Sequence, residues 1–426
     1  MRSFSEIIAE HKSGRCVGIT STCSAHPIVI EAALDHTRRA GLALIEATSN
    51  QVNQDGGYTG MRPAEFSRFV LAIAERVGVP REHVMLGGDH LGPNCWQDLP
   101  AESAMAKSER LVADYVAAGF RKIHLDCSMP CADDHAPLSD EVVAARAARL
   151  CKAAEQTARQ LGCSAPVYIV GTEVPIPGGA QHQIEELAPT EAAAASATIE
   201  AHRRAFASAG LESVWPRVVG LVVQPGVEFD HYNVVDFQAR RAAELAAVVE
   251  TLPQMVYEAH STDYQTPANL RALVQCHFAI LKVGPGLTFA MREALWALDQ
   301  IEREWLGVER SSRLRETVLR AMAETPKFWS KHYRSEGRQL ELDQQYSLSD
   351  RIRYYWPVPA VKSALNQLLA NLDANPPPLA LLAQYLPHQY EAIRAGSLRL
   401  RARELVRHQI ERVLQQYSAA CGDRLS

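Results

Sequence analysis

Acidic and imidazole side chains recur in this sequence where short apolar runs end. The segment LGGDHLGP places Asp89 beside His90 at the end of the run 84–89, with glycines on both sides. Other runs end close to Asp126 and to His260. Carboxylates and imidazoles transfer protons near neutral pH and bind divalent metal ions. One acid–histidine pair often arises by chance. It indicates a functional site only if the fold brings the other acids and histidines close to it.

Eight short runs have the composition of buried strands, since they are rich in Val, Ile and Leu and are bounded by Gly, Pro or polar residues. They lie at 18–23, 43–48, 84–89, 122–127, 166–174, 218–224, 255–260 and 278–283. Segments with helical spacing separate the runs, as in 63–78, where apolar residues recur every three or four positions. A last such helix, 287–306, follows the eighth run.

This alternation predicts the fold. Eight strand–helix units over about 290 residues indicate an α/β fold, a (β/α)₈ TIM barrel, at 1–306. The alternative is a doubly wound open sheet, but no Gly-x-Gly-x-x-Gly follows the first run and eight units favour closure. From residue 307 helical periodicity takes over, so we expect 307–426 to form a helical extension packed on the barrel.

Composition narrows the function classes. The chain has 426 residues, 47% hydrophobic and 22% charged, as in ordinary soluble proteins. A net charge of −5 gives no indication of nucleic acid or an anionic membrane as partner. No apolar run approaches the roughly 20 residues that cross a bilayer, and the N-terminal segment lacks an apolar signal core, so we expect a cytoplasmic protein. The 9 cysteines include no Cys-x-x-Cys pair, and we expect no disulfide framework.

In a TIM barrel the C-terminal strand ends form the working face, and each predicted strand here ends in polar groups. Taken singly, each histidine is better explained as a structural or surface residue. The set instead predicts a divalent metal site, Zn²⁺ being the expected ion, with the ligands His90, Glu173, His231 and His260. Such an ion would polarise a carbonyl and stabilise an enediolate. The candidate catalytic acids are Asp89, Asp126 and Glu173.

Other polar groups at the strand ends are candidates for binding a substrate. The loop 49–61 is long and dense in amides and glycines, so it could hydrogen-bond a sugar or contact a partner subunit. Glycine pairs after the fifth and eighth runs could present amides to a phosphate or simply form tight turns. The candidates are Glu46, Asn50, Gln51, Asn53, Ser128, Gly178, Gly179, Lys282, Gly284 and Gly286.

Two further features allow alternatives. Lys282 could be a Schiff-base lysine, although the histidine–acid cluster favours a metal instead. The segment 346–357, YSLSDRIRYYWP, mixes arginines with aromatic residues. It predicts a helix docked by its aromatic side chains, with contact to a phosphate or a partner as the alternative.

Several longer segments resemble a known family. The Z subunit of class II D-tagatose-1,6-bisphosphate aldolase, long mislabelled a tagatose-6-phosphate kinase, carries segments similar to CSAHP, IEATSNQVNQDGGYTGM, GGDHLGPNCWQ, GTEVPIPGG and EAHSTDYQT. The resemblance spans the whole chain. It implies a non-catalytic, chaperone-like subunit that stabilises the catalytic Y subunit in galactitol and N-acetylgalactosamine catabolism. The complex would cleave its substrate to glycerone phosphate and glyceraldehyde 3-phosphate.

The catalytic class II aldolases resemble this chain more distantly. Their Asp-His pair is similar to Asp89-His90, and their strand-five glutamate is similar to Glu173. Their metal histidines after strands six and seven are similar to His231 and His260. The resemblance therefore carries the metal ligands over to this chain.

The phosphate-binding segments of those enzymes are not kept. Where they have Gly-Gly-Ser after the strand-seven histidine, this chain has STDY at 261–264. Where they have Asn-x-Asp-Thr after strand eight, this chain has VGPG at 283–286. These departures argue against cleavage of a bisphosphate but not against metal binding.

Two functions from different classes follow. The chain is either a structural and regulatory subunit, or a metal-dependent enzyme acting on a ketohexose or its monophosphate. Members of the family are associated with C4 epimerisation between fructose and tagatose 6-phosphates, which retro-aldol cleavage, rotation of the aldehyde and re-addition would achieve. A kinase is disfavoured because no Gly-x-x-x-x-Gly-Lys-Ser/Thr loop is present. A homo-oligomer is a further expectation, since barrels with exposed rim helices commonly pair.

Overall fold

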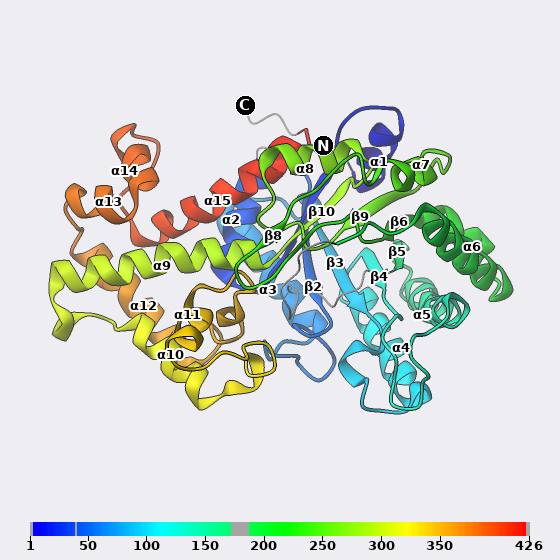
Figure 1. The fold of residues 1–426 in the computed structure, drawn as a ribbon, viewed down its shortest axis with the longest axis horizontal. Helices are drawn as coiled ribbons and strands as arrows, with labels where there is room; N and C mark the ends of the chain where they lie inside the picture. Colours follow the sequence, from blue (N-terminus) through cyan, green and yellow to red (C-terminus); the bar gives the residue numbers. More distant parts are fainter. Residues whose placement is uncertain (1–2, 39–40, 172–186, 423–426) are drawn as a thin grey trace.

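The predicted parallel strands close into a barrel (Figure 1). The computed structural model describes residues 3–38, 41–171 and 187–422. Within them the barrel has the strand order β1-β10-β9-β6-β5-β4-β3-β2, which confirms the TIM barrel and excludes the open sheet. The strands are β1 (Ile19–Cys23), β2 (Ala43–Thr48), β3 (Val84–Leu91), β4 (Lys122–Leu125), β5 (Val167–Gly171), β6 (Val218–Val222), β9 (Val256–Ala259) and β10 (Ile280–Val283).

A helix follows each barrel strand. These helices are α2 (Pro27–Thr37), α3 (Pro63–Val77), α4 (Ala101–Ala117), α5 (Asp140–Leu161), α6 (Ala192–Ser208), α7 (Ala243–Glu250), α8 (Pro267–Gln275) and α9 (Pro285–Leu306). Local sequence sets their ends: Ser139 accepts a hydrogen bond from the N–H of Val142 at the start of α5, and Gly162 ends that helix at φ 61°. An L-residue rarely adopts that backbone conformation, which explains the glycine.

Helix α1 (Phe4–Lys12) closes the N-terminal end of the barrel, a feature that strand and helix counting did not predict. Its buried residues Phe4, Ile7 and Ile8 share a hydrophobic cluster with inward-facing strand residues such as Ile19. Ser3 and Glu6 form a capping box at its start. Because this end is filled by apolar side chains, the chemistry is confined to the other end.

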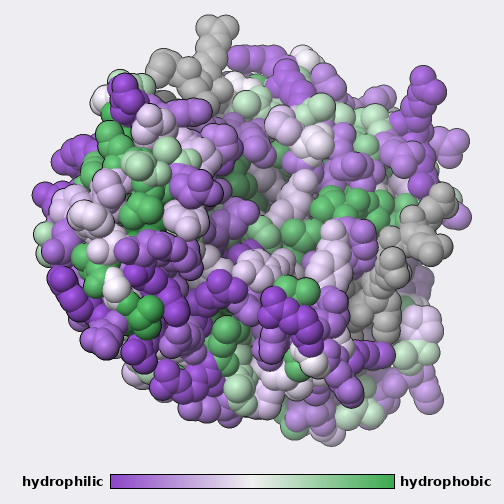
Figure 2. Space-filling view, turned by 60° about the vertical axis from the view of Figure 1, so that its left-hand side comes forward, coloured by the Kyte–Doolittle hydropathy of each residue, from purple (hydrophilic) through white to green (hydrophobic). Residues whose placement is uncertain are grey.

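Helices also make up the part of the chain after α9, as predicted. They are α10 (Leu314–Glu324), α11 (Gly337–Tyr346), α12 (Pro359–Ala374), α13 (Leu379–Tyr385), α14 (Pro387–Arg394) and α15 (Ala402–Ala420). Helix α15 returns to the barrel and packs against α2, α8 and α9. Figure 2 shows a largely hydrophilic face with hydrophobic residues in small groups. None of the described helices combines the length and apolar character that a membrane crossing requires.

The carboxylate of Glu31 ties α15 to the barrel. Its side chain is buried on α2, and it contacts Arg403 at 2.6 Å and Arg407 at 3.4 Å on α15. Arg76 of α3 lies 3.3 Å away. Burial opposes ionisation, but the three guanidinium groups, led by Arg403, lower the pKa of Glu31 below its ordinary value. One carboxylate therefore holds three helices together.

Replacement of this carboxylate should release α15. In Glu31→Ala, Arg76 and Arg403 lose their buried partner, at a cost of about 3 kcal/mol, whereas Arg407 keeps Asp35 and Glu411. We expect a lower Tm and faster amide hydrogen exchange across 402–420, measured by mass spectrometry. Glu341→Ala, which removes an exposed pair with Arg338 on α11, is the control and should change little. Unaltered protection of 402–420 in Glu31→Ala would contradict this role.

Candidate functional site

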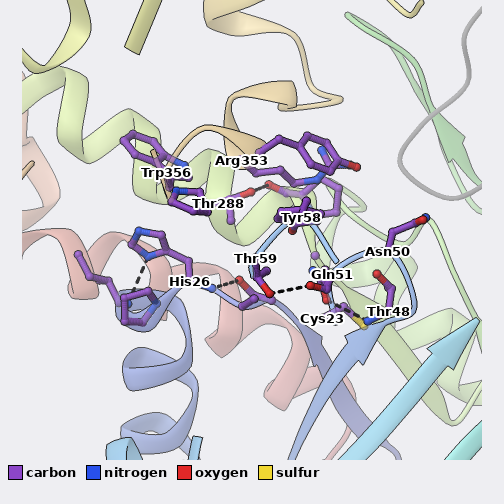
Figure 3. Close-up of a pocket in the computed structure, with 18 of the residues that line it drawn as sticks. Cys23, His26, Thr48, Asn50, Gln51, Tyr58, Thr59, Thr288, Arg353 and Trp356 are labelled. Atoms are coloured by element: carbon purple, nitrogen blue, oxygen red, sulfur yellow. Dashed lines mark hydrogen bonds between the residues drawn. The ribbon is translucent and has the colours of Figure 1, made fainter. Parts of the chain in front are cut away.

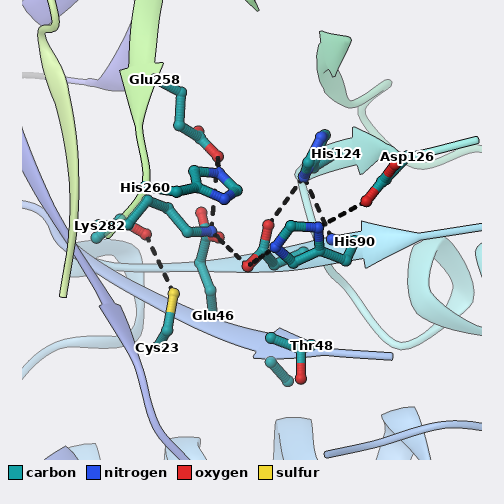
Figure 4. A network of polar contacts seen from close by, with 12 residues as sticks. Cys23, Glu46, Thr48, His90, His124, Asp126, Glu258, His260 and Lys282 are labelled. Carbon is teal, nitrogen blue, oxygen red and sulfur yellow. Dashed lines mark hydrogen bonds and ion pairs between the residues drawn. The ribbon is translucent and has the colours of Figure 1, made fainter. Parts of the chain in front are cut away.

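Two lysines lie inside the barrel among carboxylates. Lys122 of β4 is fully buried, with Nζ 2.6 Å from Glu46 Oε1 and 2.7 Å from Glu258 Oε2. Lys282 of β10 also contacts Glu46 (Figure 4), and it lies 2.8 Å from Asp89 Oδ2. These groups come from strands β2, β3, β4, β9 and β10, so only barrel closure brings them together.

The ion pairs keep both lysines charged. Burial favours the neutral amine, but the surrounding carboxylates raise the pKa of Lys122 and of Lys282 above the ordinary value. A Schiff-base lysine has to be neutral to attack a carbonyl. The structure therefore disfavours that alternative for Lys282. Glu46 serves as a counter-ion below the pocket rather than as a group open to substrate.

His90 is held in one orientation by Asp126. Its Nδ1 lies 2.7 Å from Asp126 Oδ2, and its Nε2 lies 3.6 Å from Asp89 Oδ2. Ser128 donates to Asp126 through its hydroxyl at 2.6 Å. Burial opposes ionisation, but the bonds from His90 and Ser128 lower the pKa of Asp126. A carboxylate at Nδ1 keeps a proton on that nitrogen and leaves Nε2 facing Asp89, the orientation typical of metal-binding histidines.

His124 belongs to the same cluster, although it was not among the predicted ligands. Its Nδ1 lies 2.9 Å from Asp89 Oδ1, and its Nε2 lies 2.9 Å from the carbonyl oxygen of Gly171. Both oxygens are acceptors and favour the imidazolium form, although the N–H of His90 also approaches Nδ1, at 3.3 Å. Burial opposes this charge, but Asp89 and Asp126 raise the pKa of His124. Lys122, His124 and Asp126 alternate along β4 and the residue after it, which places their side chains on one face of the sheet. This alternation could have revealed His124 as a site residue.

His260 completes the cluster. Its Nε2 lies 3.0 Å from Glu258 Oε1, and its ring centroid lies 4.9 Å from that of His90. Burial lowers the pKa of His260 to about 4, so the ring is neutral at pH 7, the form that binds metals. Ligand atoms of Asp89, His90, His124 and His260 all lie within 4.8 Å of one another.

The donor set fits a divalent cation in chemistry and in charge. Within the network two ammonium groups face four carboxylates, those of Glu46, Asp89, Asp126 and Glu258. An imidazolium at His124 offsets part of the difference and leaves negative charge unbalanced. Burying uncompensated charge is costly, so a cation at these donors would be favoured. The structure also brings Cys23 within 4.8 Å of Glu46 and Asp89, as a second possible donor group.

The structure does not bring His231 into this cluster. After β6 the chain forms a hairpin of β7 (Glu228–Phe229) and β8 (Val234–Val235), and His231 lies in its turn. Its Nδ1 lies 3.0 Å from Ser347 Oγ, and its Nε2 lies 3.1 Å from the carbonyl oxygen of His332. The unpredicted hairpin thus carries this imidazole to the extension, where it has a structural role. The predicted site residues Glu173, Gly178 and Gly179 lie outside the described residues.

The predicted substrate-binding residues divide into two groups. Asn50, Gln51, Lys282 and Gly284 line the pocket described below. Asn53 instead stabilises its own loop, since its amide donates to the carbonyl oxygen of Ser49 at 2.9 Å and its side-chain oxygen accepts from two loop N–H groups. Ser128 is engaged with Asp126, as described above.

The amides predicted to hold a phosphate are already occupied by a carboxylate of the chain. Asp263 Oδ1 accepts from the N–H of Gly284 at 3.0 Å and from that of Gly286 at 2.7 Å, at the first turn of α9. A Cβ at position 286 would stand only 3.0 Å from the same oxygen, which accounts for the glycine. Asp263, in the STDY segment, therefore occupies the position at which a phosphate was predicted to bind.

A pocket of about 490 Å³ lies between the C-terminal strand ends and the extension. Asp89, His90, His260 and Lys282 line its barrel end. Figure 3 shows Arg353 and Trp356 of the extension on the side opposite Cys23 and Thr48. The other extension residues in the wall include Tyr354, Lys362, Leu365, Asn366 and Arg403. Segment 346–357 is docked by its aromatic residues, as Tyr355 and Trp356 are buried, and it also closes the pocket.

Backbone strain is concentrated around this pocket. His90, Ser261 and Tyr264 have positive φ values of 48°, 51° and 67°, which non-glycine residues rarely adopt. Such residues cluster at sites where geometry matters more than local stability. Ser261 also donates from its hydroxyl to Glu228 Oε2 at 3.2 Å. Glu228 is completely buried, and burial raises its pKa to about 7.

The chain is thus a TIM barrel in which a buried acid–histidine cluster lies beneath a pocket that the extension partly covers. Residues 4–422 match the family model of the D-tagatose-1,6-bisphosphate aldolase subunit GatZ/KbaZ-like, so the chain belongs to this family, as its sequence predicted. A Sinorhizobium meliloti 1021 protein described as a probable tagatose 6 phosphate kinase is 48% identical, with a TM-score of 0.87 over 95% of this chain and 100% of that chain.

Two aldolases of solved structure are more distant. The YdjI aldolase from Escherichia coli K12 is 12% identical, with a TM-score of 0.40 over 84% of this chain and 94% of its own. The fructose-bisphosphate aldolase from Campylobacter jejuni is also 12% identical, with a TM-score of 0.44 over 88% of this chain and 93% of its own.

The raised pKa of Glu228 should make stability depend on pH. The folded chain keeps this carboxyl protonated up to about pH 7, whereas the unfolded chain ionises near the ordinary value of 4.5. Stability contributed by the protonated group is complete below pH 4.5 and is lost as the pH rises toward 7, a difference of about 3 kcal/mol. The Tm of Glu228→Gln relative to wild type should therefore rise between pH 5 and pH 8.

The control for this measurement is Glu200→Gln on the exposed face of α6. Its Tm relative to wild type should stay nearly constant over the same pH range. A constant difference for Glu228→Gln would show that the buried carboxyl titrates as an ordinary one.

Proposed function

We propose that the chain is the accessory subunit of a cytoplasmic class II D-tagatose-1,6-bisphosphate aldolase and stabilises the catalytic Y subunit in galactitol and N-acetylgalactosamine catabolism. The carboxylate of Asp263 on the amides of Gly284 and Gly286 carries this proposal. In the catalytic enzymes that this chain resembles, the corresponding loops bind phosphate. A phosphate at these amides would have to displace a buried anion that is already hydrogen-bonded, so a bisphosphate is poorly accommodated.

The direct test is reconstitution with the catalytic subunit. The purified chain alone should give no measurable cleavage of tagatose 1,6-bisphosphate. Added to the catalytic subunit, it should lengthen the half-life of aldolase activity at 37 °C several-fold. The variant His260→Ala should stabilise the partner as well as wild type does, because the helper role does not use the pocket.

Two results would contradict the proposal. One is bisphosphate cleavage by the chain alone at a rate similar to that of the complex. The other is an unaltered half-life of the catalytic subunit in the presence of this chain. A second purified TIM-barrel protein of similar size serves as the control for unspecific protection.

A second candidate function is favoured by the buried donor cluster at the pocket floor. The imidazoles of His90 and His260 would hold a divalent ion, Zn²⁺ by their chemistry, with Asp126 orienting His90 and Asp89 beside them. The ion when bound would polarise the carbonyl of a ketohexose or its 6-phosphate. This arrangement suits a 4-epimerase acting between the fructose and tagatose series.

The chain's own residues would then move the proton. His90 and Lys282 lower the pKa of Asp89 well below its ordinary value despite burial, so it is an ionised proton acceptor. It would take the proton of the C4 hydroxyl as the C3–C4 bond breaks, and return it after the C4 aldehyde has rotated and the bond has re-formed. The ammonium of Lys282 would offset the negative charge that develops, and the extension over the pocket would hinder escape of the two fragments.

The positioning role of Asp126 gives this candidate a binding test. Asp126→Asn replaces the charged acceptor of the His90 Nδ1–H, so zinc affinity should fall about 10–100-fold. The measurement is competition with a chromophoric chelator, supported by metal analysis of the purified protein. Asp263→Asn, outside the donor cluster, should bind zinc like wild type. Equal affinity of Asp126→Asn and wild type, or absence of zinc binding, would exclude this site. If 4-epimerase turnover survives in His260→Ala, the reaction does not use this ion site.

A further inference from the structure

Cations of the extension line the side of the pocket that faces away from the barrel. Arg353 follows α11, Lys362 lies in the first turn of α12, and Arg403 lies in the first turn of α15. Among the described residues, the acids in the pocket wall are Asp89 and Asp263, both contributed by the barrel. The pocket is therefore polarised, with carboxylates at the barrel end and positive charge at the extension end.

Two of these cations already have partners in the protein. Arg403 pairs with Glu31 at 2.6 Å. Arg353 donates to the carbonyl oxygen of Asp350 at 3.1 Å and to the hydroxyl of Tyr354 at 3.2 Å. Both guanidinium groups thus help to build the wall. Neither is the strongest candidate for binding a ligand.

Lys362 differs because its side chain is exposed in the pocket wall and makes no hydrogen bond or ion pair with the part of the chain that is described. Its neighbour His26 caps the start of α2, with Nδ1 accepting from the N–H of Ile28 at 3.3 Å. Burial, together with the positive charges of Arg403 and Lys362, lowers the pKa of His26 to about 3. A neutral His26 adds no charge, and Glu31 already balances Arg403, so Lys362 is the cation of this corner that no described acid pairs with.

We propose that Lys362 binds the single anionic end of a hexose-sized ligand whose carbonyl end faces His90 and His260. The anionic group is a phosphate or a carboxylate, because either one meets an ammonium by a charge-assisted hydrogen bond. The extension thereby supplies the specificity-determining contact. The barrel end supplies the donors for the carbonyl and hydroxyl groups.

The shape and charge of the pocket limit the ligand to one such group. Its volume of about 490 Å³ is in the range of small-molecule sites, roughly 300–1,000 Å³. The amides of Gly284 and Gly286 are filled by Asp263, so a second anion would meet a carboxylate there. This binding site goes beyond the accessory role and is independent of whether the pocket is catalytic or regulatory.

The test is calorimetric titration of the full chain with D-fructose 6-phosphate, D-glucuronate, D-fructose and D-fructose 1,6-bisphosphate. We expect Lys362→Met to weaken binding of a probe with one anionic group, D-fructose 6-phosphate or D-glucuronate, by about tenfold and to leave D-fructose binding unchanged. Lys362→Arg should restore most of the affinity. Lys152→Met, an exposed lysine on α5 outside the pocket, is the matched control and should bind like wild type. The bisphosphate should bind no more tightly than the monophosphate.

The two probes with one anionic group identify the source of the charge. A tenfold loss for D-fructose 6-phosphate alone indicates a phosphate, and a loss for D-glucuronate alone indicates a carboxylate; either supports the proposal. Equal affinities in Lys362→Met and wild type would overturn it. So would no binding of either probe to wild type, or an equal loss for D-fructose. These titrations omit the catalytic subunit, so failure of the helper role leaves their outcome unaffected.

Discussion

The buried ion pairs of Lys122 and Lys282 are the interaction on which the rest of this site depends. Each ammonium lies between carboxylates of different strands, so the charges are satisfied only when the barrel is closed. Such a network is costly to desolvate, and it contributes specificity of arrangement more than net stability. It positions Asp89 and Glu258, and these in turn contact His124 and His260. The histidine cluster is therefore a consequence of the charge network beneath it.

The amides at the start of α9, which the sequence predicted as a phosphate site, are filled by Asp263. The two lysines beneath the pocket are each paired with carboxylates, because unpaired buried charge is destabilising. The proposed accessory role and the proposed ligand-binding pocket are compatible, since the helper role as proposed does not use the pocket.

Much of the barrel could be predicted from sequence, because buried parallel strands are short apolar runs with clear ends. The ends of α5 were equally clear from Ser139 and Gly162. The hairpin that places His231 outside the histidine cluster could not be predicted, since strands of two residues leave almost no hydrophobic pattern in the sequence. His124 was overlooked because it lies inside a strand rather than at its end. Spacing also cannot say which distant helix covers the mouth of a barrel, so the contribution of Lys362 to the pocket required the structure.

The return of α15 to the barrel links the two ends of the described chain. The N–H of Gly18, just before β1, donates to the carbonyl oxygen of Cys421 at 3.0 Å, and Arg271 donates to the carbonyl oxygen of Ala420 at 3.0 Å. Residues just before the first strand are thus bonded to the end of α15. Domains generally fold as units during synthesis, from the N-terminus onward. Here β1 and β10 can pair before α15 has been made, so the bonds from Gly18 and Arg271 fasten α15 onto a barrel that is already closed.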